Sequence, residues 1–172
     1  MDALQLSLAV QCPRARAETW VAPLVAAMER YSINSHVRQA MFLAQVGHES
    51  GRLVYVREIA SGKAYEGRKD LGNVEPGDGV RFRGRGLIQV TGRANYVACG
   101  FALELDLIAR PELLERPEHA AMSAAWFWWQ KGLNELADKG DFNWITRRIN
   151  GGTNGMADRQ ALLESAMKAL KT

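Results

Sequence analysis

Apolar residues recur at helical spacing in the first third of the chain. Trp20, Leu24 and Met28 lie four residues apart, which places them on one face of a helix. A second apolar stripe begins after Ser35, a predicted N-cap, and ends near Gly51. Its apolar face is wide, because nearly every position between residues 40 and 46 is apolar or small. The pattern therefore predicts two helices, the second of them largely buried.

The second half of the chain repeats this helical pattern. Residues 93–100, 111–132, 141–151 and 157–170 each carry apolar or alanine-rich stripes at helical spacing. Asp141 is a predicted N-cap, and Asn150 with Gly151 forms a predicted helix stop. The aromatic run at residues 126–129 lies in an alanine-rich stretch, which favours core packing over a sugar-stacking surface. The fold class predicted from these patterns is mainly α.

The middle of the chain has a different character. Residues 53–59 are strand-like, residues 61–86 are rich in glycine and charge, and residues 87–92 suit a short strand or a turn. A long irregular segment inside a compact domain is usually functional. We expect an insertion over about residues 52–92, with two or three short strands, that lines a cleft between two helical lobes. The chain as a whole, residues 1–172, suits one domain.

Composition narrows the possible partners only slightly. The net charge is +3 and the pI is about 9.0, which raises affinity for polyanions without choosing among them. No nucleic-acid motif accompanies this charge, and no stretch approaches the ~20 apolar residues of a membrane span. The first residues lack the basic start of a signal peptide, which predicts synthesis in the cytoplasm. A small domain of this kind is expected to be a monomer.

Metal and cofactor motifs are missing from the sequence. The run around His48 resembles a zinc motif, but Arg52 stands where its second histidine belongs. No phosphate-binding or dinucleotide-binding glycine pattern occurs, so we expect neither a metal nor a cofactor. Cys12 and Cys99 have no close-spaced partner. Two buried thiols are favoured, although one long-range disulfide stays open.

Two carboxylates stand out as candidate catalytic groups. Glu49 lies at the C-terminal end of the predicted buried helix, where the helix dipole and apolar surroundings favour the protonated form. Glu58 follows nine residues later, after the strand-like segment. Two carboxyl groups that face each other across a groove are the machinery of a glycosidase. The alternative is that both are ordinary solvated residues, and the pair alone does not decide between these interpretations.

Three arginines alternate with small or aromatic residues at Arg81, Arg83 and Arg85. They can bind phosphate, an acidic sugar or RNA. Gly84 and Gly86, which stand between and after them, are expected to allow a close approach of the backbone.

The chain carries a series of motifs in this order: AQVGHESG, YVREI, YEGRKDLGN, PGDGVRFRGRGLIQVTGRANY, AAWFWW and RRINGG. Together and in this order, they resemble glycoside hydrolase family 19. This family includes chitinases and phage endolysins, and the resemblance covers roughly residues 35 to 165. It is closer to the lysozyme-like endolysin branch than to the plant chitinases. It implies a lysozyme-like, two-lobed helical fold.

The resemblance also implies roles for individual residues. Glu49 matches the general acid, Glu58 the general base, and Thr91 a hydroxyl that holds the attacking water. His48 is expected to support the site rather than to act in catalysis. The residues expected to bind substrate or line the same cleft are His48, Tyr65, Arg68, Gln89, Asn95, Asn150 and Arg159.

The sequence also departs from the family pattern. Asn154 stands where plant members carry a glutamate, so a network of three carboxylates is not expected. Glu66 is a second candidate for the general base. The insertion is short and plant-type disulfides are missing, which suggests an open groove with few subsites.

The resemblance implies a peptidoglycan-degrading endolysin, a muramidase-like inverting glycosidase that reaches the cell wall through a holin-type pore. An injected or secreted antibacterial effector fits almost as well. A chitinase that acts on GlcNAc polymers is the alternative, and a non-catalytic carbohydrate-binding module is less favoured.

Overall fold

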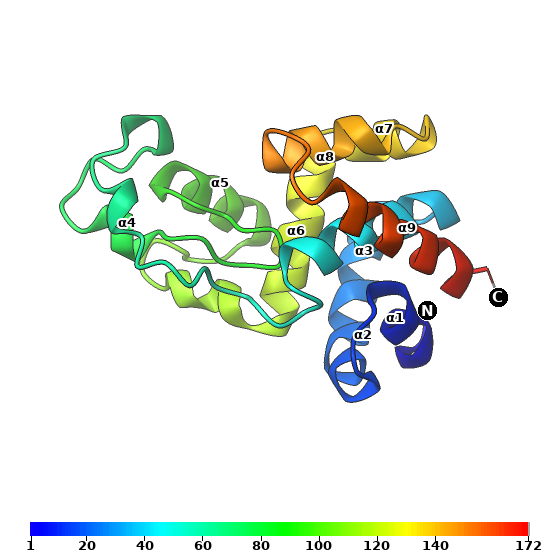
Figure 1. Cartoon of the computed structure of the whole chain (residues 1–172). Coiled ribbons are helices and arrows are strands. Elements are labelled where there is room, and N and C mark those ends of the chain that lie inside the picture. Colours follow the sequence, from blue (N-terminus) through cyan, green and yellow to red (C-terminus); the bar gives the residue numbers. More distant parts are fainter. Residues whose placement is uncertain (172) are drawn as a thin grey trace.

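The computed structural model describes residues 1–171, and the predicted mainly α-helical fold is confirmed (Figure 1). The elements in chain order are α1 (Ala3–Val10), α2 (Arg14–Arg30), α3 (His36–Glu49), η1 (Lys63–Tyr65), η2 (Lys69–Leu71), α4 (Asp78–Arg81), α5 (Arg93–Leu103), η3 (Pro111–Glu115), α6 (Pro117–Gln130), α7 (Leu133–Asp138), α8 (Phe142–Asn150) and α9 (Met156–Ala169). The three elements named η are short 3₁₀ helices.

The helices form two lobes on either side of α6 (Figure 1). One lobe holds α1, α2, α3 and α9, where α9 packs on both α1 and α3. Helices α7 and α8 lie beside this lobe, and α7 contacts α3 and α6. The other lobe holds the insertion with α4 and α5. One buried cluster runs through the core, with Phe42 and Trp128 in edge-to-face contact at 5.5 Å between ring centroids.

The predicted helix ends are confirmed where capping residues mark them. The Ser35 hydroxyl accepts from the backbone N–H of Arg38 at 3.2 Å, and α3 begins at the next residue. The Asp141 carboxylate accepts from the N–H of Trp144 at 3.0 Å at the start of α8. Gly151 ends α8 in the left-handed conformation. Local side-chain chemistry thus sets these ends, which is why the sequence predicts them.

The predicted short strands are wrong. In the described residues of the insertion, pairing is limited to single bridges of Arg85 with Arg57 and with Val90. Gly86 follows with φ +95, and a Cβ there would come within 2.6 Å of the Ser123 hydroxyl on α6. The close approach to α6 and the tight turn between residues 85 and 90 leave no room for a longer ladder.

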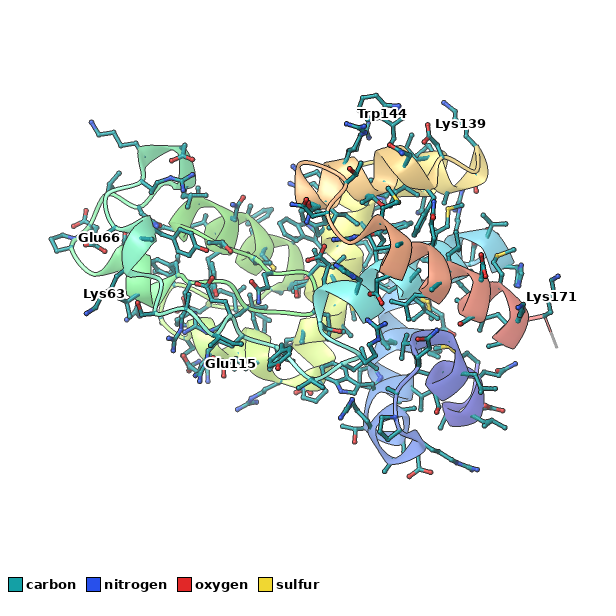
Figure 2. The ribbon with its side chains drawn as sticks, in the orientation of Figure 1. Lys63, Glu66, Glu115, Lys139, Trp144 and Lys171 are labelled. Carbon is teal, nitrogen blue, oxygen red and sulfur yellow. The ribbon has the colours of Figure 1, made fainter. Side chains whose placement is uncertain are left out.

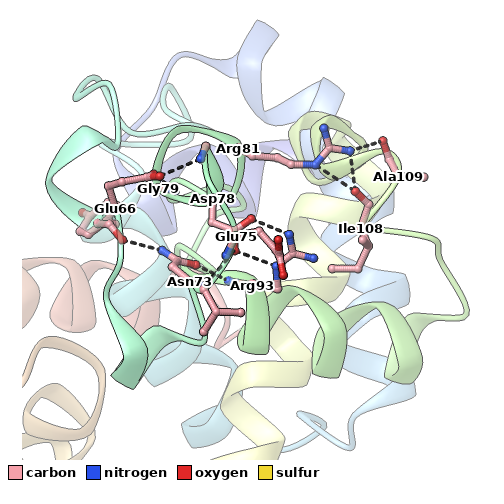
Figure 3. Close-up of polar contacts among 12 residues, drawn as sticks. Glu66, Asn73, Glu75, Asp78, Gly79, Arg81, Arg93, Ile108 and Ala109 are labelled. Atoms are coloured by element: carbon pink, nitrogen blue, oxygen red, sulfur yellow. Dashed lines mark hydrogen bonds and ion pairs between the residues drawn. The ribbon is translucent and has the colours of Figure 1, made fainter.

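Polar side chains hold the insertion together in place of a sheet (Figure 3). The Asp78 carboxylate is nearly fully buried and accepts two hydrogen bonds from the Arg93 guanidinium, at 2.8 and 2.6 Å. Asn73 donates to the carbonyl of Tyr65 and accepts from the backbone N–H of Arg93, both at 2.8 Å. Glu66 accepts from two backbone N–H groups around the start of α4. A network of buried hydrogen bonds can fix an irregular backbone in one conformation.

The two cysteines and the aromatic run follow the favoured interpretations. Cys12 and Cys99 are free and buried, so they do not pair. Trp126 and Trp128 are buried, which confirms core packing there, whereas Trp129 is 57% exposed. Among residues 1–171, none of the helices has both the length and the apolar character needed to cross a membrane.

Candidate active site

Glu49 is the last residue of α3 and has a cationic partner. The Nη2 atom of Arg159, on α9, donates to the Glu49 carboxylate at 2.5 Å. The Arg159 side chain is fully buried, while 24% of the Glu49 side chain is exposed. The apolar surroundings that the sequence suggested for Glu49 are therefore wrong: its carboxyl group pairs with a buried guanidinium and is partly exposed.

The rest of the Arg159 guanidinium is also bonded. Its Nη1 atom donates to the side-chain oxygen of Gln45, and its Nε atom donates to the carbonyl of Asn154 at 3.1 Å. The Gln45 amide in turn donates to the Thr146 hydroxyl at 2.8 Å. Gln45 lies one turn before Glu49 on the same face of α3, a spacing that could have singled it out in the sequence. The contacts join α3, α8 and α9 directly beneath the candidate acid.

His48 turns toward α9. Its Nδ1 atom lies 2.6 Å from the Asp158 carboxylate, which also accepts two hydrogen bonds from Arg52 at 2.8 and 2.5 Å. The Arg52 hydrogen bonds hold the pKa of Asp158 well below its usual range; His48 contributes in the same direction, and burial opposes both. Asp158 and Arg52 were not predicted from the sequence. These contacts suit the supporting role expected of His48.

Glu58 is held by the insertion. One carboxylate oxygen accepts from the backbone N–H of Gly84 at 3.0 Å, and the other accepts from the Tyr65 hydroxyl at 2.9 Å. Burial raises the pKa of Tyr65, and its hydrogen bond to Glu58 adds to the effect, so the phenol stays a donor at neutral pH. Glu58 also lines a pocket of about 400 Å³ together with Arg57 and Arg83. The structure therefore brings Tyr65 and Glu58 together at a surface hollow.

Glu66, the competing candidate for the base, lies in different surroundings. Its two carboxylate oxygens accept from the backbone N–H groups of Gly77 at 2.7 Å and Gly79 at 2.9 Å (Figure 3). Both Glu66 and Lys63 lie at the outer end of the insertion lobe (Figure 2). Glu66 closes the turn that leads into α4, whereas Glu58 lines the pocket with Arg57 and Arg83.

Gln89, Thr91 and Asn95 line one small pocket of about 110 Å³, together with Trp126 and Phe127 from α6. The Asn95 amide donates to the Thr91 carbonyl at 2.8 Å. The pocket therefore offers neutral amides and a hydroxyl against an aromatic wall, a combination that suits sugar hydroxyl and acetamido groups.

Gly84 connects this pocket to Glu58. A Cβ atom at Gly84 would come within 2.5 Å of the Gln89 side-chain oxygen, so the Gln89 amide lies against the Gly84 backbone. The N–H of the same residue donates to Glu58. The close approach expected of Gly84 is confirmed, and it joins two of the predicted site residues.

Two predicted site residues make no side-chain hydrogen bond to the other candidates in the part of the chain that the structure describes. The Arg68 guanidinium pairs with Asp70 at 2.8 and 2.5 Å on the exposed surface. Asn150 is exposed at the end of α8. Across residues 1–171, no three His, Cys, Asp or Glu side chains gather closely enough to hold a metal ion.

Solved structures with the same fold come from bacteria and plants. Chitinase C from Streptomyces griseus HUT6037 has a TM-score of 0.79 at 24% identity, and the match covers 99% of this chain and 92% of that one. A family GH19 class IV chitinase from Zea mays has a TM-score of 0.78 at 23% identity, with coverage of 100% and 92%. These likenesses establish the fold.

Sequence relatives are closer. An endochitinase of Arabidopsis thaliana is 39% identical over 113 residues, which are 66% of this chain and 39% of the relative. The chain thus spans about two fifths of that endochitinase. A glycosyl hydrolase family 19 domain-containing protein of Haemophilus influenzae is 32% identical over 173 residues, which cover 83% of this chain and 84% of that protein. A family profile described as chitinase class I matches residues 25–161. The chain therefore belongs to glycoside hydrolase family 19 and is a chitinase-like glycosidase.

Proposed function

We propose that this protein hydrolyses β-1,4 bonds between the N-acetylated amino sugars of bacterial peptidoglycan, with inversion at the anomeric carbon. The observation that carries the proposal is the separate anchoring of two carboxylates. Glu49 is tied to α9 through Arg159, and Glu58 is tied to the insertion through Gly84 and Tyr65. Side chains fixed in this way are preorganised for acid and base work.

In the proposed reaction Glu49 donates its proton to the glycosidic oxygen as the bond from that oxygen to the anomeric carbon breaks. Glu58 removes a proton from a water molecule, whose oxygen attacks the anomeric carbon from the opposite face. One bond forms as the other breaks, so the first product is the α-anomer. Thr91 would hold the water, while Gln89 and Asn95 would bind sugar amide and hydroxyl groups.

Peptidoglycan is the favoured substrate for two reasons. The motifs resemble the endolysin branch, and the net charge of +3 suits an anionic wall. Chitin is the second candidate, because the Arabidopsis relative is an endochitinase. A non-catalytic binding module has less support, since both carboxylates are present and anchored.

Purified peptidoglycan and chitin oligomers assayed side by side separate the two substrates. We expect the protein to release muropeptides with newly formed reducing ends, detected by mass spectrometry, and NMR to show the α-anomer first. The mass of each reducing-end sugar identifies the bond that is cut. Activity on chitin alone would reject the wall substrate, and a β-anomer as the first product would reject inversion.

Substitution of the three glutamates tests the site. Glu49→Gln and Glu58→Gln should each lower kcat by about 10²-fold or more, the usual contribution of general acid–base catalysis. Glu66→Gln is the control: it should reduce thermal stability while the folded protein keeps its kcat, because Glu66 holds the turn before α4. If the Glu58→Gln variant lyses bacteria normally and the Glu66→Gln variant does not, the general base is Glu66 and not Glu58.

The biological setting forms part of the same proposal. We propose that residues 1–172 act as one monomeric catalytic unit, made in the cytoplasm of a bacterial host and released to the wall through a holin-type pore. Expression with and without a holin tests delivery: lysis should require the holin. Light scattering tests the monomer, and a dimer mass would reject it.

A further inference from the structure

The pocket beside Glu58 contains two arginines to which the proposed acid–base chemistry assigns no role. Residues 54–59, Arg83 and Glu115 line this hollow of about 400 Å³, a volume in the range of small-molecule sites. Its apolar wall includes Tyr55, which is 48% exposed, and Ile59, which is 86% exposed. Arg57 and Arg83 supply the cations, and we call this hollow the Arg57–Arg83 pocket.

Among residues 1–171, the Arg83 side chain has no hydrogen-bond or ion-pair partner. Its Nε atom is buried and makes no hydrogen bond, and its guanidinium forms no ion pair with any described residue. The two Glu58 carboxylate oxygens accept from Gly84 and Tyr65 and not from Arg83. A buried donor without an acceptor is costly in a folded protein, which is why such an atom points to a missing partner.

Arg57 is also weakly compensated. Its nearest carboxylate is Glu115, at 3.6 Å from Nη1, and half of the Arg57 side chain is exposed. The Glu115 carboxylate is already bonded to Arg85, a buried residue, at 2.8 Å. The pocket is lined by two guanidinium groups, those of Arg57 and Arg83, and by two carboxylates, those of Glu58 and Glu115. Because Glu115 is bonded to Arg85 and lies 3.6 Å from Arg57, the hydrogen-bond donors of Arg57 and Arg83 are left available for an incoming anion.

We infer that Arg83, with Arg57, binds a carboxylate carried by the substrate next to the bond that is cut. The planar guanidinium donates hydrogen bonds in a fork that matches a carboxylate. Arg83 would then be a specificity residue that selects acidic glycans over neutral ones. The inference rests on the proposed function, and it sharpens the substrate class to an N-acetylated glycan with an acidic substituent.

Two parts of the wall polymer offer such a carboxylate. One is the lactyl group of a sugar without its peptide, and the other is an acidic residue of the stem peptide. Three tetrasaccharides distinguish them: neutral chitotetraose, a GlcNAc–MurNAc tetrasaccharide with free lactyl groups, and the same glycan carrying stem peptides. Binding is measured calorimetrically in the Glu49→Gln background, so that no ligand is hydrolysed.

We expect the Glu49→Gln protein to bind at least one carboxylated ligand about tenfold more tightly than chitotetraose, a factor that corresponds to ~1.4 kcal/mol. Adding Arg83→Gln should abolish that preference, and adding Arg83→Lys should keep part of it. Arg14→Gln is the matched control, because it removes one positive charge from an exposed arginine of α2. Arg57→Gln, at a half-exposed position, provides a second test if Arg83→Gln fails to fold.

The inference is overturned if the ratio of affinities stays the same in both Arg83→Gln and Arg57→Gln, or if all three ligands weaken equally. Hydrolysis of peptidoglycan by the unmodified protein is measured in parallel. If the unmodified protein hydrolyses the wall but the ratio of affinities for carboxylated and neutral ligands does not change in the arginine variants, only the role of Arg83 is rejected. If the affinity ratio depends on Arg83 but the unmodified protein does not hydrolyse the wall, the carboxylate site is supported and the proposed function is rejected.

Discussion

Arg159 is the residue on which the candidate acid depends most directly. Its buried guanidinium bonds to Glu49, Gln45 and the Asn154 carbonyl. Such a group is stable in the interior only when each of its donors has an acceptor. The resemblance to the family identified Arg159, but Gln45 and Thr146 were missed because a lone polar residue in an apolar helix does not reveal its partner.

We predict that Arg159→Met lowers both stability and activity. It leaves the Glu49 carboxylate and the Gln45 amide without their donor, at a cost of about 3 kcal/mol in the free energy of unfolding. Chemical denaturation measures the stability, and kcat on peptidoglycan measures the activity. Arg147→Met, on the exposed face of α8, is the control and should change neither. Equal effects of the two substitutions would contradict the role given to Arg159.

Asp158 should make stability depend on pH in the acid range. Its pKa in the folded protein lies below the unfolded value of about 3.9, so it stabilises the fold above about pH 4. This contribution is lost as the pH falls from there through the folded pKa. We expect Asp158→Asn to be less stable at pH 7 and to lose less stability than the parent between pH 5 and pH 2.

Urea denaturation at a series of pH values measures this difference. Glu112→Gln, at an exposed carboxylate on η3, is the control and should follow the parent curve. Parallel curves for Asp158→Asn and the parent protein would show that Asp158 does not couple folding to protonation. Because 38% of the Asp158 side chain is exposed, the effect should shrink as the salt concentration rises.

At the scale of elements, the helices are predictable and the insertion is not. Ser35 and Asp141 cap their helices through bonds that span three residues, so a short window of sequence contains all the information. Residues 53–59 have strand-like side chains, but the partner segment turns at Gly86 and leaves single bridges. Local propensity does not report the geometry of a partner segment, and tertiary contacts override it here.

The two cysteines provide a test of packing at the element scale. Burial of Cys99 in α5 raises the pKa of its thiol to about 12, and burial also raises the pKa of Cys12, after α1. We predict that neither thiol of the native protein reacts with Ellman's reagent at pH 8 on a timescale of minutes. Unfolding without a reductant should release two reactive thiols. Fewer than two would indicate a disulfide, contrary to the structure.

At the scale of the whole molecule, the candidate site is assembled from distant parts of the chain. Glu49 and Arg159 are 110 residues apart, and Glu58 belongs to the insertion. Periodicity identifies each helix but gives no distance between helices. The pairing of Glu49 with Arg159 therefore could not be predicted from the spacing of residues. The Arg57–Arg83 pocket was missed for the same reason, although the alternating arginines indicated an acidic ligand.

The long separation between Glu49 and Arg159 has a consequence for synthesis. A ribosome makes α3 well before α9, and during that interval the growing chain has no partner for its candidate acid. Helix α9 must leave the exit tunnel and pack on α1 and α3 before the site is complete. The order of translation thus delays the pairing of Glu49 with Arg159 until α9 has been made and has folded.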